Sequence, residues 1–296
     1  MRAPDRRGAP RSPRAGFALV ELVVVLALTL VVAGGAYRVL LGSQRYYRLL
    51  AATLEVHQAE RAALEVLAAE LRELDPAGGD ILAAGADSIT IRAARLLAFA
   101  CAPADAAGRV VVRDSLIYAF RAADPSRDRI RVFREGDPDR ADDDAWPEFG
   151  LVSVQAGQPC ADGAPGTALE LDGPPAALDS VSSGAPVRAY ERVTYRLYAD
   201  GGGEWWLGVR EYAGGRWAAI SPVAGPLEPR TGLALEFLDA AGAVTAEPAR
   251  IARIELVVRG LSGARLPAAG GAGRLADSLR TSVQPRNVRR EGGAAP

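Results

Sequence analysis

An apolar run from Phe17 to about Tyr37 contains a single carboxylate, Glu21. The run is roughly 20 residues long and would span about 30 Å as a helix, which matches the hydrocarbon core of a bilayer. A charged side chain inside such a span costs at least about 2.5–3.5 kcal/mol and usually marks a functional position with a partner. The run therefore predicts a transmembrane helix over residues 17–37, with Glu21 as its candidate functional residue.

The residues before this run are basic, with one acid, Asp5, against five arginines: Arg2, Arg6, Arg7, Arg11 and Arg14. This asymmetry predicts that the leader stays in the cytoplasm and that the chain after about Tyr37 crosses the membrane. An ordinary secretory signal peptide, cut near Ala33-Gly34-Gly35, is the alternative. It is disfavoured because Glu21 is a poor residue for the core of a signal peptide.

Gly16, Phe17 and Glu21 have a characteristic spacing. This segment resembles the type IV pilins and type II secretion pseudopilins, in which a basic leader ends in Gly, the next residue is usually Phe, and a Glu is fifth in the processed chain. The resemblance implies a prepilin leader over residues 1–16, cleavage after Gly16 by a prepilin peptidase, and N-methylation of Phe17. It also implies an inner-membrane helix that later packs into the core of a fibre.

Three later segments look like those of PilW-like minor pilins, with the J-type minor pseudopilins second: Ser115-Leu116-Ile117-Tyr118, Asp124-Pro125-Ser126-Arg127-Asp128, and residues 278–287. The implied function is a structural subunit that initiates or caps a pilus-like fibre. Its partners would be other minor pilins or pseudopilins. Its location would be the inner membrane, as a single-pass protein with a periplasmic C-terminal domain, and then the pilus or pseudopilus.

The charge on Glu21 suggests a mechanism of assembly. A new amine at Phe17 of one subunit and the Glu21 carboxylate of a neighbour would lie at a similar depth in the membrane. At about 4 Å and an effective dielectric near 20, such a pair is worth about 4 kcal/mol before desolvation, which cancels much of the gain. Glu21 would then set the register of assembly more than its affinity. The alternative is a glutamate hydrated near the lipid headgroups.

Composition argues against an enzyme. The formal net charge is −1, and the sequence contains no lysine, which excludes a P-loop lysine, a Schiff base and a Ser-x-x-Lys nucleophile. His57 is the only histidine, so no multi-histidine metal site is expected and a Ser-His-Asp triad is disfavoured. We expect no cofactor, no metal and no catalytic residue. A hydrolase built on carboxylates alone is a weak alternative, because no acid pair stands out by its spacing.

The helix is expected to continue beyond the membrane and to end at about Leu74, before Asp75-Pro76, so that it occupies residues 17–75. Apolar residues and one histidine recur at steps of three and four, and this stripe should dock on a sheet. Its members are Leu50, Leu54, His57, Leu64, Leu67, Leu71 and Leu74. His57 is expected to pack at the edge of the docking face rather than to bind a ligand.

Residues 76–285 show period-two alternation and predict an extracytoplasmic β-rich domain, followed by a flexible tail at 286–296. The predicted strands are 88–92, 109–113, 115–121, 129–135, 151–155, 191–198, 204–212, 216–220, 233–238, 250–259 and 276–283. Residues 156–189 are rich in Gly, Pro, Ala and Ser and predict a long loop. The fold class is therefore α+β, with a long N-terminal helix packed on an antiparallel sheet, which is pilin-like.

Three further features have competing interpretations. Cys101 and Cys160 both follow the membrane span, and a disulfide is favoured over two free thiols. The acidic loop with Asp137, Asp139, Asp142, Asp143 and Asp144 lacks the pattern of an EF-hand, so a solvated turn is favoured over a Ca²⁺ site. The aromatic residues Trp205, Trp206, Tyr212 and Trp217 are expected in the core. The alternative is a stacking platform, which would make the chain an anchored DNA- or glycan-binding domain.

Overall fold

The computed structural model describes residues 18–286, except 138, 141–142, 180 and 269–270. The predicted leader 1–16, with its cleavage position Gly16, and the predicted methylation position Phe17 lie outside the described residues, as do residues 287–296 of the predicted tail. The chain divides into two compact units, residues 1–51 and residues 52–296, and each is described by itself.

The first unit contains the beginning of helix α1 (Leu19–Arg72). This helix includes an 18-residue window with a mean hydropathy of 2.5, none of which is buried, so by length and composition it can cross a membrane. The Thr29 hydroxyl donates a hydrogen bond of 2.7 Å to the Val25 carbonyl oxygen. The Thr29 hydroxyl therefore needs no water, which suits an apolar environment.

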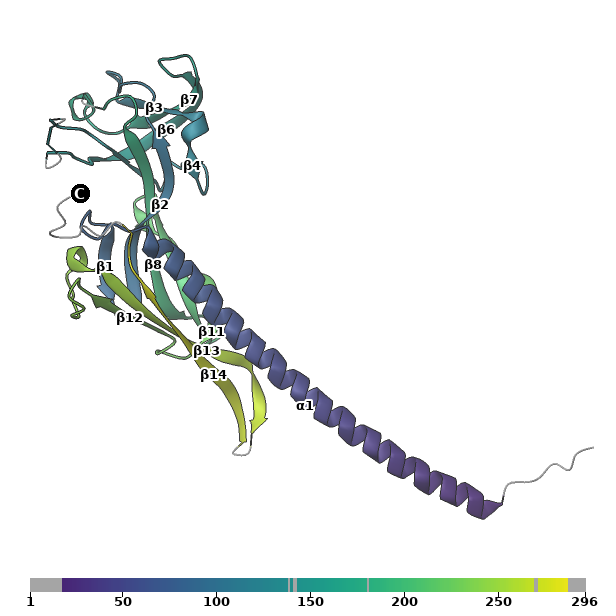
Figure 1. The fold of residues 1–296 in the computed structure, drawn as a ribbon. Coiled ribbons are helices and arrows are strands. Elements are labelled where there is room, and N and C mark those ends of the chain that lie inside the picture. The colour runs from purple at the N-terminus through teal and green to yellow at the C-terminus, as the bar shows by residue number, and fades with distance from the viewer. Residues whose placement is uncertain (1–17, 138, 141–142, 180, 269–270, 287–296) are drawn as a thin grey trace, which may run out of the picture. The chain divides into compact units, whose positions relative to one another are not determined.

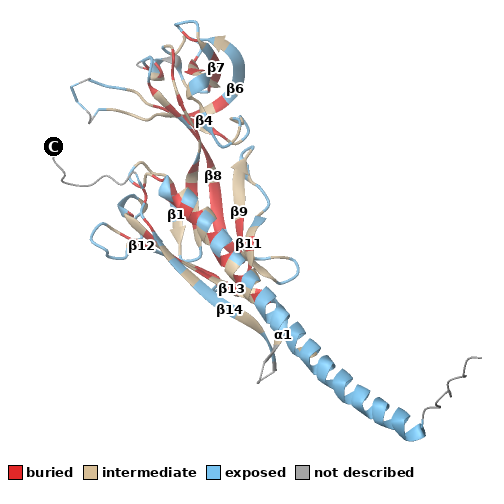
Figure 2. Ribbon diagram, turned by 45° about the vertical axis from the view of Figure 1, so that its right-hand side comes forward, coloured by how far each residue is buried: buried red, intermediate tan, exposed pale blue. Residues whose placement is uncertain are grey.

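Residues 52–72 of α1 belong to the second unit and pack on its sheet. The buried positions recur at steps of three and four, as expected for one face of a helix, and Figure 2 shows them as red segments among exposed and intermediate ones in this part of α1. They are Ala52, Val56, Ala59, Glu60, Ala63, Leu67, Ala68 and Leu71. The helix ends at Arg72 rather than at the predicted Leu74.

The docking face differs from the predicted stripe at its N-terminal end. Leu50 and Leu54 are exposed, and small residues take their place in the buried face. The reason is the close approach of the helix to Gly260, where a Cβ atom would lie 2.8 Å from a Val56 methyl carbon and 3.1 Å from the Val56 carbonyl oxygen. A leucine between helix and strand would not fit at this separation.

Over the described residues the sheet contains fourteen strands, and every pairing between them is antiparallel. The strands are β1 (Ile81–Gly85), β2 (Ser88–Phe99), β3 (Arg109–Arg113), β4 (Tyr118–Ala119), β5 (Arg129–Val132), β6 (Glu148–Pro159), β7 (Pro165–Leu171), β8 (Pro186–Ala199), β9 (Trp205–Ala213), β10 (Arg216–Trp217), β11 (Ser221–Leu227), β12 (Leu233–Leu238), β13 (Arg253–Ala268) and β14 (Gly271–Val283). Short 3₁₀ helices occur at Asp114–Leu116, Pro175–Ala177 and Pro248–Arg250.

Strands β2 and β8 pair along almost their whole length, from Ser88 opposite Arg196 to Phe99 opposite Pro186, and lie side by side in Figure 1. Two hydrophobic cores lie along this pair. The first core contains Ile89 and Ile91 of β2, residues of α1, and residues of β9 and β11 to β14. The second core contains Ala98 of β2, Val187 of β8, and residues of β3, β5, β6 and β7.

The α+β class, with a long apolar helix and a large antiparallel sheet, is confirmed. The predicted loop over 156–189 is wrong, because β6 extends to Pro159, β7 occupies Pro165–Leu171 and β8 begins at Pro186. The predicted strand 115–121 is a 3₁₀ turn followed by the two-residue β4, and the predicted strand 216–220 is reduced to β10. Strands β1 and β11 were not predicted.

Candidate assembly site

Glu21 lies in the first turn of α1, and its Oε2 atom accepts a hydrogen bond of 3.3 Å from the Ala18 backbone nitrogen. This is the position from which a glutamate reaches back to the residue that caps a helix. A negative charge is also favoured there, because the first turn carries the positive end of the helix dipole. The carboxylate therefore has a local role at the helix start.

The apolar side chains before and after Glu21 are not covered by any described residue of their own unit. Leu19 is 81% exposed, Leu30 71% and Val31 74%. Soluble proteins rarely leave a continuous apolar surface of this kind open to water. The segment is therefore built to contact lipid, other apolar helices, or both in succession.

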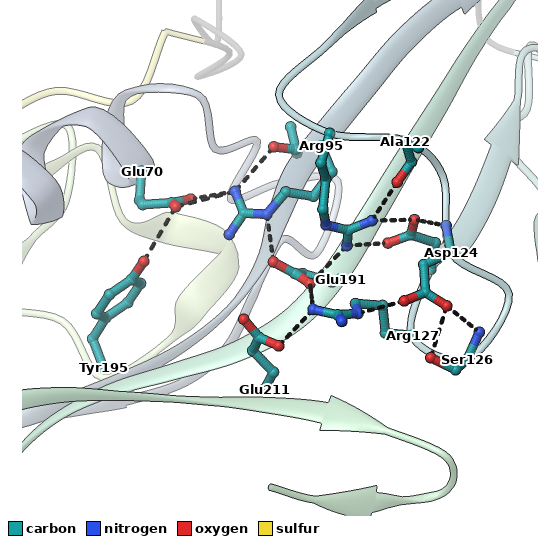
Figure 3. A network of polar contacts seen from close by, with 12 residues as sticks. Glu70, Arg95, Ala122, Asp124, Ser126, Arg127, Glu191, Tyr195 and Glu211 are labelled. Carbon is teal, nitrogen blue, oxygen red and sulfur yellow. Dashed lines mark hydrogen bonds and ion pairs between the residues drawn. The ribbon is translucent and has the colours of Figure 1, made fainter. Parts of the chain in front are cut away.

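In the second unit, a network of ion pairs surrounds Glu191 of β8, whose side chain is 4% exposed (Figure 3). One Glu191 oxygen accepts a hydrogen bond from Arg95 Nε of β2. The other oxygen accepts one of 2.8 Å from Arg121 Nη2. A buried carboxylate is tolerated when its oxygens are paired in this way.

One arm of this network reaches the helix. Arg95 Nη1 lies 3.0 Å from Glu70 Oε1 of α1, and the Tyr195 hydroxyl donates to the same Glu70 oxygen at 3.1 Å. Burial alone would lower the pKa of the Arg95 guanidinium, but Glu70 and Glu191 raise that pKa above its usual value. Arg95 therefore stays charged, and it connects α1 to both central strands.

The other arm orders the segment that precedes β5. Arg121 forms two hydrogen bonds to the fully buried Asp128 carboxylate, at 2.7 and 2.8 Å. Arg127 joins Asp124 at 2.9 Å and Glu211 of β9 at 2.7 Å. The segment Asp124–Asp128, noted in the sequence for its resemblance, thus contains the acidic and basic side chains that connect this loop to the sheet.

The predicted disulfide is present. Cys101, which follows β2, is bonded to Cys160, which follows β6, and the two residues are 59 apart in sequence. In the chain-entropy model, closing a loop of this length stabilises the fold by about 4 kcal/mol, because the unfolded chain loses conformational entropy. The bond joins the ends of two strands that line the second core.

The aromatic residues do not form an open platform. Trp205 packs against the first core, and Trp206 donates a hydrogen bond of 3.1 Å to Asp200. The Tyr212 and Trp217 rings meet edge to face at 5.3 Å. The Arg210 guanidinium lies 4.9 Å from the Trp217 ring centre. These rings are half-buried and already in contact with protein groups.

The described carboxylates of the acidic loop accept hydrogen bonds from backbone nitrogens. Asp137 N donates to Asp143 Oδ2 at 2.8 Å, and Gly136 N donates to Asp144 Oδ1 at 3.3 Å. Asp139 N donates to Asp137 Oδ1 at 3.1 Å. Asp142 lies outside the described residues. Hydrogen bonds of this kind are those of a turn.

Sequence reasoning missed the partners that lie far apart in the chain. Arg95 and Glu191 were not singled out, because Arg95 lies beyond the predicted strand 88–92 and Glu191 is the first residue of the predicted strand 191–198. Glu60 carried a signal, because it is a carboxylate three residues after His57 on the docking face, and it is fully buried. His57 itself is half-buried and lies 2.9 Å from Asp277 of β14.

Comparison with known proteins gives one match. Residues 11–37 match the family described as the prokaryotic N-terminal methylation motif. The match includes Gly16, Phe17 and Glu21 and covers the apolar run from Phe17 to Tyr37. No curated protein and no solved structure matches the chain.

Proposed function

Because this N-terminal methylation motif is typical of type IV pilins and pseudopilins, we propose that the chain is a minor pilin or pseudopilin, a structural subunit that initiates or caps a pilus-like fibre. The observation that carries the proposal is the motif at residues 11–37 on a helix whose apolar surface is exposed around Glu21. Such a surface suits a subunit that passes from lipid into a bundle of similar helices.

Processing is the first step of the proposed function. A prepilin peptidase removes residues 1–16 by cleavage between Gly16 and Phe17, and Phe17 is then N-methylated. The basic leader lies in the cytoplasm, which places the second unit in the periplasm. The disulfide between Cys101 and Cys160 supports this placement, because such bonds persist in oxidising compartments.

Assembly is the second step. The Glu21 carboxylate is held at the first turn of α1 by the Ala18 backbone nitrogen. Cleavage creates an amine at Phe17, and in the assembly this amine on one subunit pairs with Glu21 of a neighbour. An unpaired charge in lipid is costly, so the pairing selects one register between two otherwise featureless apolar helices.

The test is to replace Glu21 by Gln, which keeps the shape and removes the charge. Membrane insertion and cleavage should survive, since the span becomes more apolar. Recovery with fibre partners should fall at least tenfold, because the neighbouring amine is left without its counter-charge at a cost of about 3–5 kcal/mol. The measurement is co-purification of processed protein with its partners at matched membrane levels, with mass spectrometry of the N-terminus.

Two results would overturn the proposal in separate ways. A mature protein that starts near Gly35 or Ala36 would identify a secretory signal peptide and remove the pilin interpretation. Equal recovery of wild-type and Glu21→Gln protein would remove Glu21 from assembly. The matched control is Thr29→Val, a change in the same helix that deletes only a hydroxyl bonded within the helix. The recovered partners also distinguish a pilus from a J-type subunit of a secretion pseudopilus.

A further inference from the structure

Three potential metal ligands from distant parts of the sequence meet where α1 lies against the sheet. His57 and Glu60 are three residues apart on α1, so they lie on the same side of the helix. Asp277 belongs to β14 and stands opposite Gly260 of β13. All three residues belong to the second unit.

The ligand atoms of these residues lie close together. His57 Nε2 is 2.9 Å from Asp277 Oδ2, and one ligand atom from each of the three residues lies within 4.8 Å of the other two. A zinc ion about 2.0–2.2 Å from each ligand requires these atoms within about 4.4 Å of one another. Small side-chain rotations are therefore enough to reach bonding distances.

Glu60 supplies a second and independent observation. The residue is fully buried, and its Oε1 atom accepts a hydrogen bond of 3.1 Å from the Gly260 backbone nitrogen. Its Oε2 atom is buried and has no hydrogen-bond partner among the described residues. A carboxylate with one orphaned buried oxygen needs a compensating group.

No arginine supplies that compensation. All 35 basic residues of the sequence are arginines, and many of them pair with carboxylates elsewhere in the sheet. Within the described part of the chain, neither Glu60 nor Asp277 forms an ion pair with an arginine, and the partner of Asp277 is His57. The two carboxylates and the imidazole together offer three ligand atoms to a divalent cation.

We propose that His57, Glu60 and Asp277 bind a divalent metal ion of the zinc class. An imidazole nitrogen with two carboxylate oxygens suits Zn²⁺ and its first-row neighbours, whereas Ca²⁺ prefers six to eight oxygens. Three protein ligands leave one position for water or for a ligand from another molecule. Because two ligands come from α1 and one from β14, the bound ion links the helix to the β13–β14 hairpin.

The test uses the full-length protein in detergent, purified through a tag without histidines. His57 is the only histidine, and both cysteines are in the disulfide, so a bound Zn²⁺ with a nitrogen ligand can be assigned to this cluster. Equilibrium dialysis against Zn²⁺, followed by elemental analysis, should give one ion per chain. His57→Gln and Asp277→Asn should each reduce the bound zinc at least tenfold.

The matched control is Glu55→Gln. Glu55 lies on the same helix and accepts a hydrogen bond of 3.2 Å from Gly263 of β13, but it lies outside the cluster. This variant should still bind one Zn²⁺. Binding that is equal in wild type and His57→Gln would come from exposed carboxylates and would overturn the proposal, as would the absence of stoichiometric binding by the wild type.

If the variants do not fold, a measurement on the wild type alone still tests the proposal. Diethyl pyrocarbonate modifies free imidazole, and the adduct on the peptide with the single histidine can be measured by mass spectrometry. Zn²⁺ should protect His57 from modification with a one-to-one titration, whereas Ca²⁺ should not. Modification at the same rate with and without Zn²⁺ would contradict the proposal. None of these results depends on cleavage at Gly16, so they are independent of the proposed role in the fibre.

Discussion

At the scale of single residues, Glu191 has more influence on the second unit than any surface ion pair. Its two oxygens bind Arg95 and Arg121, which carry the helix contact and the loop contact respectively. Replacing such a buried pair by apolar residues of similar volume can be neutral, but removal of one partner leaves charges buried without compensation. Glu191 is therefore a position where a single change acts on three parts of the fold.

We expect Glu191→Gln to lower the free energy of unfolding by about 3–5 kcal/mol, because two guanidinium groups lose a buried counter-charge. Urea unfolding followed by circular dichroism at pH 7 measures the change. Glu211→Gln is the control, since its side chain is 40% exposed and pairs with Arg127 at the edge of the network. Exposed pairs contribute about 0–1 kcal/mol. Equal losses in the two variants would show that burial does not set the strength of this network.

Single residues were predicted from sequence only where they break a local pattern. Glu21 interrupts an apolar run, and Cys101 and Cys160 are the only cysteines, so each could be identified without coordinates. Glu191 lies on the same buried face of β8 as Ala189 and Val193, but it was the first residue of the predicted strand 191–198 and so did not interrupt a predicted apolar face. Its partner Arg95 is separated from it by almost a hundred positions, and only the register of β2 and β8 brings the two together.

At the scale of elements, Glu148 at the start of β6 joins several strands. Its carboxylate lies 2.8 Å from Arg129 of β5, 3.3 Å from Arg92 of β2 and 3.7 Å from Arg192 of β8. Burial alone would raise the pKa of Glu148, but the Tyr190 hydroxyl together with Arg92 and Arg129 outweighs it and holds the pKa below its usual value of 4.5. The charged carboxylate thus ties the edge of the second core to the central strand pair.

The lowered pKa fixes the sign of a pH dependence. A carboxyl group with a lower pKa in the folded state stabilises the fold above its unfolded pKa, near 4.5, and this contribution is lost as pH falls through the folded pKa. At pH 7, Glu148→Gln should lower the free energy of unfolding by ~1.5–3 kcal/mol. The difference from wild type should shrink below about pH 4.5.

Urea unfolding at pH 7, 5, 4 and 3.5 checks this dependence. Glu236→Gln is the control, because Glu236 is exposed on β12 and should give little difference at any of these pH values. A loss in Glu148→Gln that stays constant down to pH 3.5 would contradict the role of its charge.

Elements were predicted well where their pattern was regular and poorly where composition hid it. The long helix and most of the alternating strands followed from periodicity. Strand β7 was predicted as loop because Pro165, Gly166 and Ala168 have low strand propensity. In the structure β7 pairs with β3 on one side and β6 on the other, and Leu169 and Leu171 are buried in the second core. Packing on both sides outweighs local propensity, which is context-dependent in sheets.

At the scale of the whole molecule, the boundary between the two units falls inside α1 rather than at its end. Residues 18–51 leave most of their apolar side chains exposed, whereas residues 52–72 contribute Val56, Leu67 and Leu71 to the buried face. The two parts of this helix are therefore suited to different surroundings. Its first part suits lipid or neighbouring helices, and its second part is a component of the sheet domain.

This division predicts different outcomes for two truncations exported to an oxidising periplasm. A fragment of residues 52–296 keeps the docking helix and should unfold cooperatively. A fragment of residues 75–296 loses Val56, Leu67 and Leu71, and burial of each such side chain is worth about 1.5–3 kcal/mol. The three burial energies together are comparable to the free energy of unfolding of a typical domain, about 5–15 kcal/mol. The shorter fragment should therefore aggregate or lose its cooperative transition, as measured by thermal circular dichroism and size-exclusion chromatography.

Because both fragments keep Cys101 and Cys160, disulfide formation serves as the internal control for export. A shorter fragment that melts cooperatively at the same temperature as the longer one would show that the sheet forms its first core without α1.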